Sequence, residues 1–119
     1  MSNSERKYAT IARTLFAGTK SVSLSTNEWL ESFEADLVIR VTCADSTVVT
    51  IDIELDGPSH HASGSGKRFD DLRDDYLRRE HGVFVERWNL MSRRNMSHDE
   101  IASEIRATVL KHVPSLVVV

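Results

Sequence analysis

Hydrophobic and polar residues alternate strictly along one stretch near the middle of this 119-residue chain. Since successive side chains of a β-strand point to opposite faces, the alternation predicts a strand over residues 47–56 with one aliphatic and one acidic face. Like charges stacked on one face repel each other, so we expect a metal ion or a proton to accompany them. The aliphatic face consists of Val49, Ile51, Ile53 and Leu55, and the other face carries Thr50, Asp52, Glu54 and Asp56.

A second apolar segment, residues 36–43, precedes this strand and is predicted to pair with it as a hairpin. The short polar turn at residues 44–46 has the composition that such a connection needs. If the aliphatic faces of the two strands coincide, Asp36 lies on the same side of the sheet as Glu54 and Asp56. Three carboxylates from neighbouring strands then converge.

Helical periodicity marks three further segments. Residues 8–16 and 67–80 each place apolar side chains on one stripe, and Ser97-x-x-Glu100 has the spacing of a capping box that opens a third helix. Gly82 is suited to end the second helix, and the apolar residues 83–88 predict a strand that returns alongside the acidic strand. The inward-facing residues of the second helix are predicted to be Phe69, Leu72, Tyr76 and Leu77.

Several apolar residues outside these segments are also predicted to be buried. Ser25-x-x-Glu28 has capping-box spacing as well, so we expect a short helix or turn that anchors Trp29 in the core. Trp88 is predicted as a core residue too. The apolar residues 116–119 are expected to pack as an edge strand, or to mark the cut end of a longer protein. Together the elements predict one α/β domain over residues 1–119.

Composition narrows the class of protein. A single cysteine, Cys43, excludes an internal disulfide and a cysteine-based zinc site, so an intracellular, reducing compartment is expected. No stretch approaches the twenty apolar residues that span a bilayer, so no membrane partner is expected. The first twenty residues are basic and rich in Ser and Thr, which is typical of a mitochondrial or plastid targeting segment, but the apolar stripe that follows gives better support to an amphipathic first helix of the domain.

The net charge of −3 conceals a segregated distribution. Basic residues gather at residues 5–20 and again between residues 78 and 94, whereas acidic residues gather on the central strand and at residues 70–75. This pattern suits an acidic metal site within a basic rim, and solvated helix faces produce the same pattern.

The run Glu54-x-Asp56-Gly57-Pro58-Ser59-His60 resembles the signature of RAP domains, which are small RNA-binding modules of organellar RNA-processing proteins. It is also similar to the strand end of short, Vsr-like PD-(D/E)XK nucleases. The resemblance continues through residues 68–77 and 82–88 and covers roughly residues 33–110. It implies the restriction-endonuclease-like fold, which has three layers: a central mixed sheet with an N-terminal hairpin-type strand pair, flanked by helices.

By this resemblance, Asp36, Glu54 and Asp56 are the expected ligands of Mg²⁺ or Mn²⁺ and the expected catalytic acids. Asp56 stands where the usual nuclease motif has lysine, a departure that the RAP and Vsr-like groups share. His60 is a candidate general base or outer-shell ligand. Lys67 or Arg73 is a candidate to supply the missing positive charge.

Phosphate contacts are expected from a rim of arginines, with ordinary alternatives for each residue. Asp36 also suits a turn or cap, and Asp52, further from the strand end, is expected to be solvated or paired with an arginine. Arg73 also suits pairing with acids of its own helix, and the other rim residues also suit solvated helix faces. The rim residues are Arg73, Arg78, Arg79, Arg87, Arg93 and Arg94.

Three functions follow from these residues and this resemblance. The first is a nucleic-acid-binding domain, with RNA favoured over DNA, that retains metal-dependent phosphodiester cleavage or has lost it. The second is an active Mg²⁺-dependent endonuclease acting on DNA or RNA. The third is a catalytically silent assembly module of an organellar ribonucleoprotein, with this chain as the last part of a longer protein.

Overall fold

The computed structural model describes residues 2–57 and 69–119 in full and the backbone alone at residues 64–68. His60 lies outside the described residues, as does the side chain of Lys67. The elements in chain order are α1 (Asn3–Phe16), β1 (Val22–Leu30), β2 (Phe33–Thr42), β3 (Val48–Asp56), α2 (Gly64–His81), β4 (Val83–Asn89), the 3₁₀ turn η1 (Met91–Arg93) and α3 (His98–His112).

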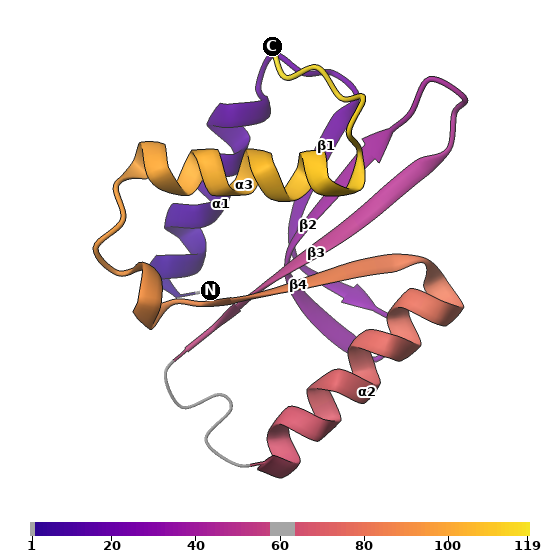
Figure 1. Cartoon of the computed structure of the whole chain (residues 1–119), viewed down its shortest axis with the longest axis vertical. Helices are drawn as coiled ribbons and strands as arrows, with labels where there is room; N and C mark the ends of the chain where they lie inside the picture. The colour runs from indigo at the N-terminus through magenta and orange to yellow at the C-terminus, as the bar shows by residue number, and fades with distance from the viewer. Residues whose placement is uncertain (1, 58–63) are drawn as a thin grey trace.

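The four strands form one mixed sheet in the order β1-β2-β3-β4. β1, β2 and β3 are a meander of antiparallel neighbours, whereas β4 runs parallel to β3 after the crossover through α2 (Figure 1). Gly82 has a φ of 66° and its N–H donates to the carbonyl of Arg78, which ends α2 as the sequence predicts. The predicted hairpin and the predicted return of the strand alongside β3 are both confirmed.

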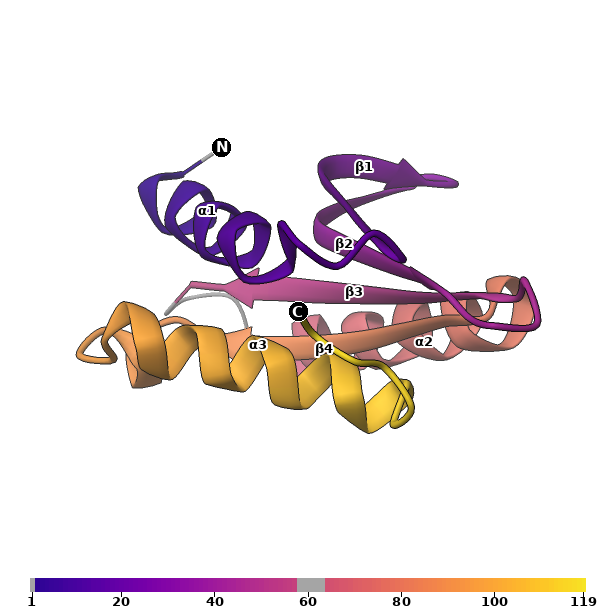
Figure 2. The same cartoon turned by 90° about the horizontal axis from the view of Figure 1, so that it is seen from above.

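Helices cover both faces of this sheet. Figure 1 looks along the sheet, with α1 and α3 on one side and α2 on the other, and Figure 2 shows the same chain from above. The aliphatic face of β2 and β3 packs against α1 and α3, because the register places Leu37 opposite Ile53 and Ile39 opposite Ile51. The α/β class, with a mixed sheet between helices, is therefore confirmed.

The α1 and α3 helices begin at capping boxes and contribute one apolar stripe each to the core. The hydroxyl of Ser97 accepts from the N–H of Glu100, and the Glu100 carboxylate accepts from the N–H of Ser97, as the spacing predicts. Ser2 and Glu5 form the same arrangement at α1. The core residues from these helices include Tyr8, Ile11, Ala12, Phe16, Ile101, Ile105 and Val109.

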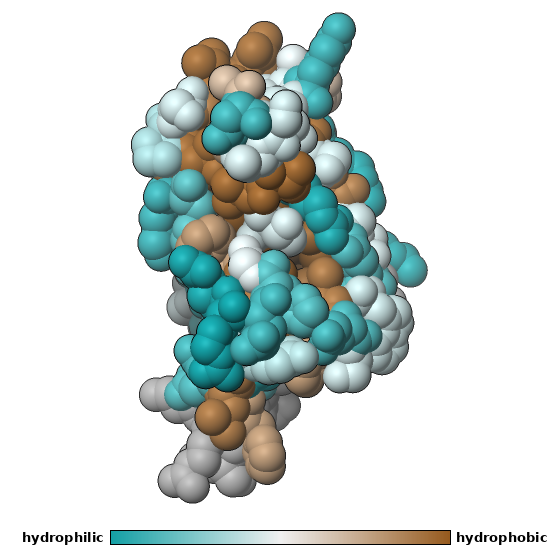
Figure 3. Space-filling view, turned by 90° about the vertical axis from the view of Figure 1, so that its right-hand side faces the viewer, coloured by the Kyte–Doolittle hydropathy of each residue, from teal (hydrophilic) through white to brown (hydrophobic). Residues whose placement is uncertain are grey.

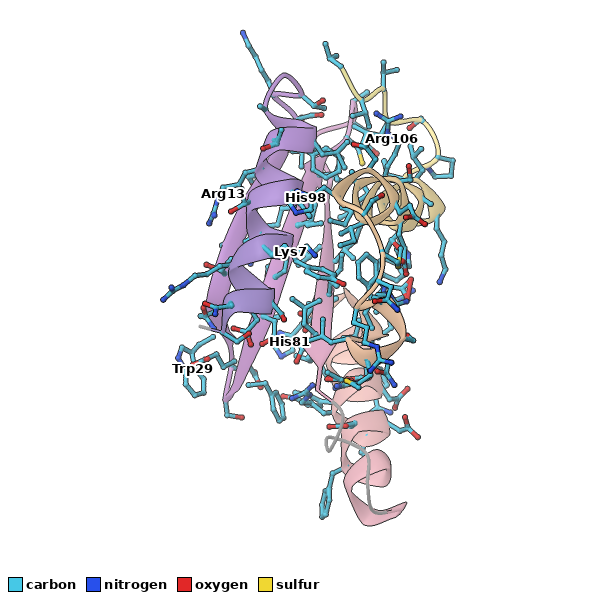
Figure 4. The ribbon with its side chains drawn as sticks, turned by 90° about the vertical axis from the view of Figure 1, so that its left-hand side faces the viewer. Lys7, Arg13, Trp29, His81, His98 and Arg106 are labelled. Atoms are coloured by element: carbon cyan, nitrogen blue, oxygen red, sulfur yellow. The ribbon has the colours of Figure 1, made fainter. Side chains whose placement is uncertain are left out.

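The expected short helix at Ser25-x-x-Glu28 is wrong, because these residues belong to β1. Pairing with β2 along eight residues overrides the local capping signal, which is worth only about 1 kcal/mol. Glu28 forms an ion pair with Arg40 of β2, which lowers the pKa of Glu28 to about 2. Trp29 is 63% exposed and not in the core, and Figure 4 shows it at the molecular surface.

The predicted inward face of α2 is also wrong in part. Leu77 is buried and Tyr76 half-buried, but Phe69 is 72% exposed and Leu72 is exposed as well. Arg73 and Asp74 take the inward positions instead, because the face of the sheet beneath α2 is acidic and not apolar. Figure 3 shows hydrophobic side chains at the lower end of the molecule, where the first half of α2 lies.

The C-terminal residues do not form the expected edge strand. The N–H of Val119 donates to the hydroxyl of Thr19 at 3.0 Å, while Leu116 and Val118 pack against the core beside it.

No described helix is long and apolar enough to cross a bilayer.

The two tryptophans differ in burial, which makes a direct test of these packing assignments. Trp88 is 5% exposed, so Trp88→Ala should lower the free energy of unfolding by about 3–5 kcal/mol. Trp29→Ala should change it by less than about 0.5 kcal/mol. Urea denaturation followed by far-UV circular dichroism measures both values, and a comparable loss in the two variants would contradict the structure.

A buried acidic cluster beneath helix α2

The hairpin register places Asp36 beside Glu54 on the face of the sheet that α2 covers. The backbone N–H of Asp36 donates to Oε2 of Glu54 at 3.0 Å. In return the N–H of Leu55 donates to Oδ2 of Asp36 at 2.8 Å. The predicted convergence of Asp36 with the acids of β3 is confirmed, and the two carboxylates also tie the ends of β2 and β3 together.

The carboxylates of β3 are buried and face arginines. Glu54 is 5% exposed, and its Oε1 lies 3.2 Å from Nη2 of Arg73 on α2. Asp56 is similarly buried, and its Oδ2 lies 3.4 Å from Nη1 of Arg87 on β4. Each arginine approaches from a different element, so the acidic strand end is enclosed by α2 and by β4.

Arg87 also anchors α2 to the sheet. Its Nε and Nη2 donate to the two carboxylate oxygens of Asp74 at 2.7 and 2.8 Å, which is the bidentate geometry of a strong ion pair. Its Nη2 lies 3.7 Å from Oδ1 of Asp70. These carboxylates raise the pKa of Arg87, so the guanidinium stays charged despite its burial. The ion pairs of Arg87 therefore join β3, β4 and α2.

The turn between β1 and β2 closes the other side of Arg73. The Arg73 guanidinium lies over the ring of Phe33, 5.5 Å from its centroid. Tyr76 contacts the same ring edge-on and donates from its hydroxyl to Glu31 at 2.7 Å. His81 at the end of α2 also reaches Glu31, at 2.9 Å. The outer surface of this turn is thus held against the second half of α2.

Asp52 is buried within this cluster, at 2% exposure, and is not the solvated or arginine-paired residue that we expected. Its carboxyl group shares a hydrogen bond with Glu54, and its Oδ1 has no hydrogen-bond partner among the described residues. Burial, and next the hydrogen bond and the negative charge of Glu54, raise the pKa of Asp52 far above its usual range. These effects favour the protonated form of Asp52 in the folded protein.

Asp36 is the second carboxyl group of the cluster with a strongly raised pKa. Burial, and next the repulsion from Glu54, raise the pKa of Asp36 to about 6, although the hydrogen bond from Leu55 opposes the change. Two arginines thus neutralise part of the negative charge of the acidic face, and the raised pKa values of Asp52 and Asp36 favour protonation of the rest.

As arranged here, these residues do not fit a metal ion. No three Asp, Glu, His or Cys side chains are grouped for coordination within the described parts of the chain. Both oxygens of Glu54 are occupied, one by Arg73 and the other by the N–H of Asp36. Mg²⁺ and Mn²⁺ need open carboxylate oxygens, so a metal at Asp36, Glu54 and Asp56 remains a prediction for a different arrangement.

The remaining arginines of the predicted rim are mostly engaged with their own neighbours. Arg78 lies over the ring of Phe84, 4.5 Å from its centroid, and Arg79 pairs with Asp75 at 3.0 Å. Arg93 donates to Glu104 and lies over the ring of Trp88, so two contacts hold its side chain in place. Arg78 and Arg94 are the two of the six that form no ion pair with a described residue.

Basic side chains without an ion-pair partner among the described residues gather elsewhere, in the layer of α1 and α3. Residues 1–20 and 90–113 contain eight basic and four acidic residues, whereas the rest of the chain contains seven basic and fourteen acidic residues. The net charge of each segment reveals this layer in the sequence, whereas the net charge of the whole chain conceals it. The basic side chains of this layer that have no ion-pair partner among the described residues are Arg6, Lys7, Arg13, Lys20, Arg94 and Arg106.

Comparisons of this chain with protein-family models, with curated proteins and with solved structures found no match. The chemistry of the site is therefore inferred from its own geometry.

The ion pair between Arg73 and Glu54 should be essential to the outer layer. Arg73→Met leaves a buried carboxylate without its cation, which should lower the free energy of unfolding by about 3–5 kcal/mol. Arg79→Met, at an exposed pair on the same helix, is the matched control and should cost no more than about 0.5 kcal/mol.

Adding Glu54→Gln to Arg73→Met should recover part of the lost stability, because the stranded charge is removed as well. Urea denaturation of the wild type, Arg73→Met, Arg79→Met and the double variant Arg73→Met/Glu54→Gln gives the four free energies of unfolding. Equal losses in Arg73→Met and Arg79→Met would show that Glu54 does not depend on Arg73.

The raised pKa of Asp36 predicts a pH-dependent gain of stability in Asp36→Asn. Between pH 4 and pH 6 the folded wild type holds a proton that the unfolded chain releases, so wild-type stability falls as pH rises through this window. Asparagine cannot ionise and still accepts from Leu55. The variant should match the wild type near pH 4 and exceed it by about 1 kcal/mol at pH 7, after allowance for solvent screening. A difference independent of pH would contradict the assignment.

Proposed function

We propose that this chain is a nucleic-acid-binding domain, with RNA as its preferred ligand, built on a restriction-endonuclease-like scaffold. The observation that carries the proposal is the layer of α1 and α3, where basic side chains have no ion-pair partner among the described residues. Phosphate groups are the polyanionic partners that such cations attract, and their binding releases the counterions of the nucleic acid. The ion-paired arginines of α2 and β4 are less available for this purpose.

The order of the elements supports the scaffold. A helix, a three-stranded meander, a crossover helix and a parallel fourth strand fit the three-layer fold that the resemblance implies. The adjacency of Asp36 on β2 and Glu54 on β3 also supports the positions that the resemblance implies for the two acids. The run Asp56-Gly57-Pro58-Ser59-His60 supports the RAP-like branch, and with it RNA.

The contacts of the acids favour binding over cleavage. Arg73 and Arg87 occupy the carboxylates of Glu54 and Asp56, so the acids neutralise the protein's own cations and hold α2 in place. A phosphodiester in this region would meet buried negative charge with its counter-charges already used. Substitution at Glu54 is therefore expected to change stability more than affinity.

A metal-dependent endonuclease is the second candidate, favoured by the convergence of Asp36 with Glu54 at the end of the sheet. It requires Arg73 and Arg87 to leave the carboxylates before a cation can enter. An assembly module within a ribonucleoprotein is the remaining alternative if nucleic acid does not bind.

The proposal predicts salt-dependent binding without cleavage. Fluorescence anisotropy with labelled single-stranded RNA and DNA of one length should give tighter binding to RNA, and log K should fall linearly with log salt concentration. The same strands incubated with Mg²⁺, Mn²⁺ or EDTA should stay intact on a denaturing gel.

Two other results would redirect the assignment. Cleavage that needs a metal and disappears in Glu54→Gln would establish the second candidate. Absence of binding to every strand at low salt would rule out both nucleic-acid functions.

A further inference from the structure

We infer that a single strand of nucleic acid binds in the groove between α1 and the segment 90–94, with its phosphates at Lys7 and Arg94. This inference rests on the proposed function and locates its contact surface. The groove encloses a cavity of about 310 Å³. That volume lies at the lower end of the range of small-ligand sites, and it suits one nucleotide. The lining residues are Ser4, Lys7, Tyr8, Leu90, Met91, Arg93 and Arg94.

A second cavity extends the groove along α1. It encloses about 190 Å³ between α1 and the start of α3. Residues 4, 7 and 8 line the first cavity and residues 10, 11, 14 and 15 the second, which is the spacing of one side of a helix. The two cavities therefore lie one after the other along α1, and His98 lines the second.

The floor of the groove consists of side chains that several contacts hold in place. Tyr8 is buried and meets Trp88 edge-on, with the ring centroids 6.1 Å apart. Arg93 lies over the same indole ring at 5.0 Å, and it is held by Glu104 and by the carbonyl of Asn89. Because Glu104 neutralises Arg93, this side chain shapes the floor of the groove and does not add net charge to it.

Lys7 and Arg94 supply the charge that a ligand can neutralise, since neither forms an ion pair with a described residue. Figure 4 shows Lys7 on the side of α1 that faces α3, whereas Arg13 extends from the opposite side. Of the acids near Lys7 and Arg94, Glu104 is held by Arg93 and Glu5 by the capping box, whereas Asp99 lines the second cavity. The two free cations are thus placed at a depression and not merely on a charged surface.

The apolar wall favours a single strand over a duplex. Met91 is exposed beside Arg94, and Leu90 lines the same cavity. Unpaired bases have open faces and edges that bury favourably against such side chains, while the phosphates stay at the cations. A duplex keeps its bases stacked and paired, so it offers the groove its backbone alone.

A comparison of two double variants tests the inference. Lys7→Ala/Arg94→Ala removes two charges from the groove, and Arg13→Ala/Arg106→Ala removes two from the same layer at exposed positions outside both cavities. The probe is fluorescently labelled oligouridylate, which has no stable secondary structure. Anisotropy titrations over a range of KCl concentrations, on the full chain, give the affinity and its salt slope.

The groove variant should bind at least about tenfold more weakly, and its salt slope should decrease in magnitude by about 1.4, or about 0.7 for each lost phosphate contact. The control variant should stay within about twofold of wild type. Both should keep the wild-type urea midpoint, because neither pair of side chains is buried or ion-paired within the described residues.

Each other outcome is decisive. Equal weakening in the two variants means that the layer attracts RNA by charge alone, and unchanged affinity in both places the contact elsewhere; either result overturns the groove. A duplex RNA of the same length that competes as well as the single strand overturns the single-strand specificity. If the wild type does not bind at all, the proposed function itself fails.

Discussion

The outer layer of this fold depends on neutralising the carboxylates that β3 presents beneath α2. Burying an ionised carboxylate without a partner is far more costly than the few kcal/mol by which a domain is stable, so the helix above must supply cations. Arg73 does so for Glu54, and Arg87, anchored by Asp74, does so for Asp56. This requirement sets the rotation of α2 about its axis. It also explains why Phe69 and Leu72 face outward.

The features that could be predicted from the sequence are those that depend on local rules of side-chain placement. The alternation along residues 48–56 predicts both the strand and its acidic face, because side-chain direction in a strand depends only on position. The inward face of α2 was not predictable in the same way. The hydrophobic-stripe rule assumes an apolar surface beneath the helix, and here that surface carries Asp52, Glu54 and Asp56. Trp29 was misplaced because pairing of β1 with β2 outweighed a capping signal.

The acidic cluster was predictable to the extent that it follows from the hairpin. Once β2 and β3 pair through their aliphatic faces, Asp36 must stand beside Glu54. The closure by arginines was not predictable, since Arg73 lies 19 residues from Glu54 and Arg87 lies 31 from Asp56. Many other pairings of the same residues satisfy the sequence equally well. The raised pKa of Asp52 was not predictable for the same reason, because burial is a property of the tertiary structure.

The segregation of charge across the sheet bears on whether binding and cleavage can coincide. The carboxylates lie beneath α2, whereas most basic side chains that have no ion-pair partner among the described residues lie on or beside α1 and α3, and the apolar core separates the two faces (Figure 1). A strand that follows the groove along α1 therefore remains on the far side of the sheet from Glu54. The groove and the acidic strand end nevertheless lie at the same end of the sheet, since the N–H of Leu90 donates to the carbonyl of Asp56 at 2.9 Å. Under the proposed function, such a domain holds nucleic acid on one face of the sheet, while its buried acids neutralise Arg73 and Arg87 on the other.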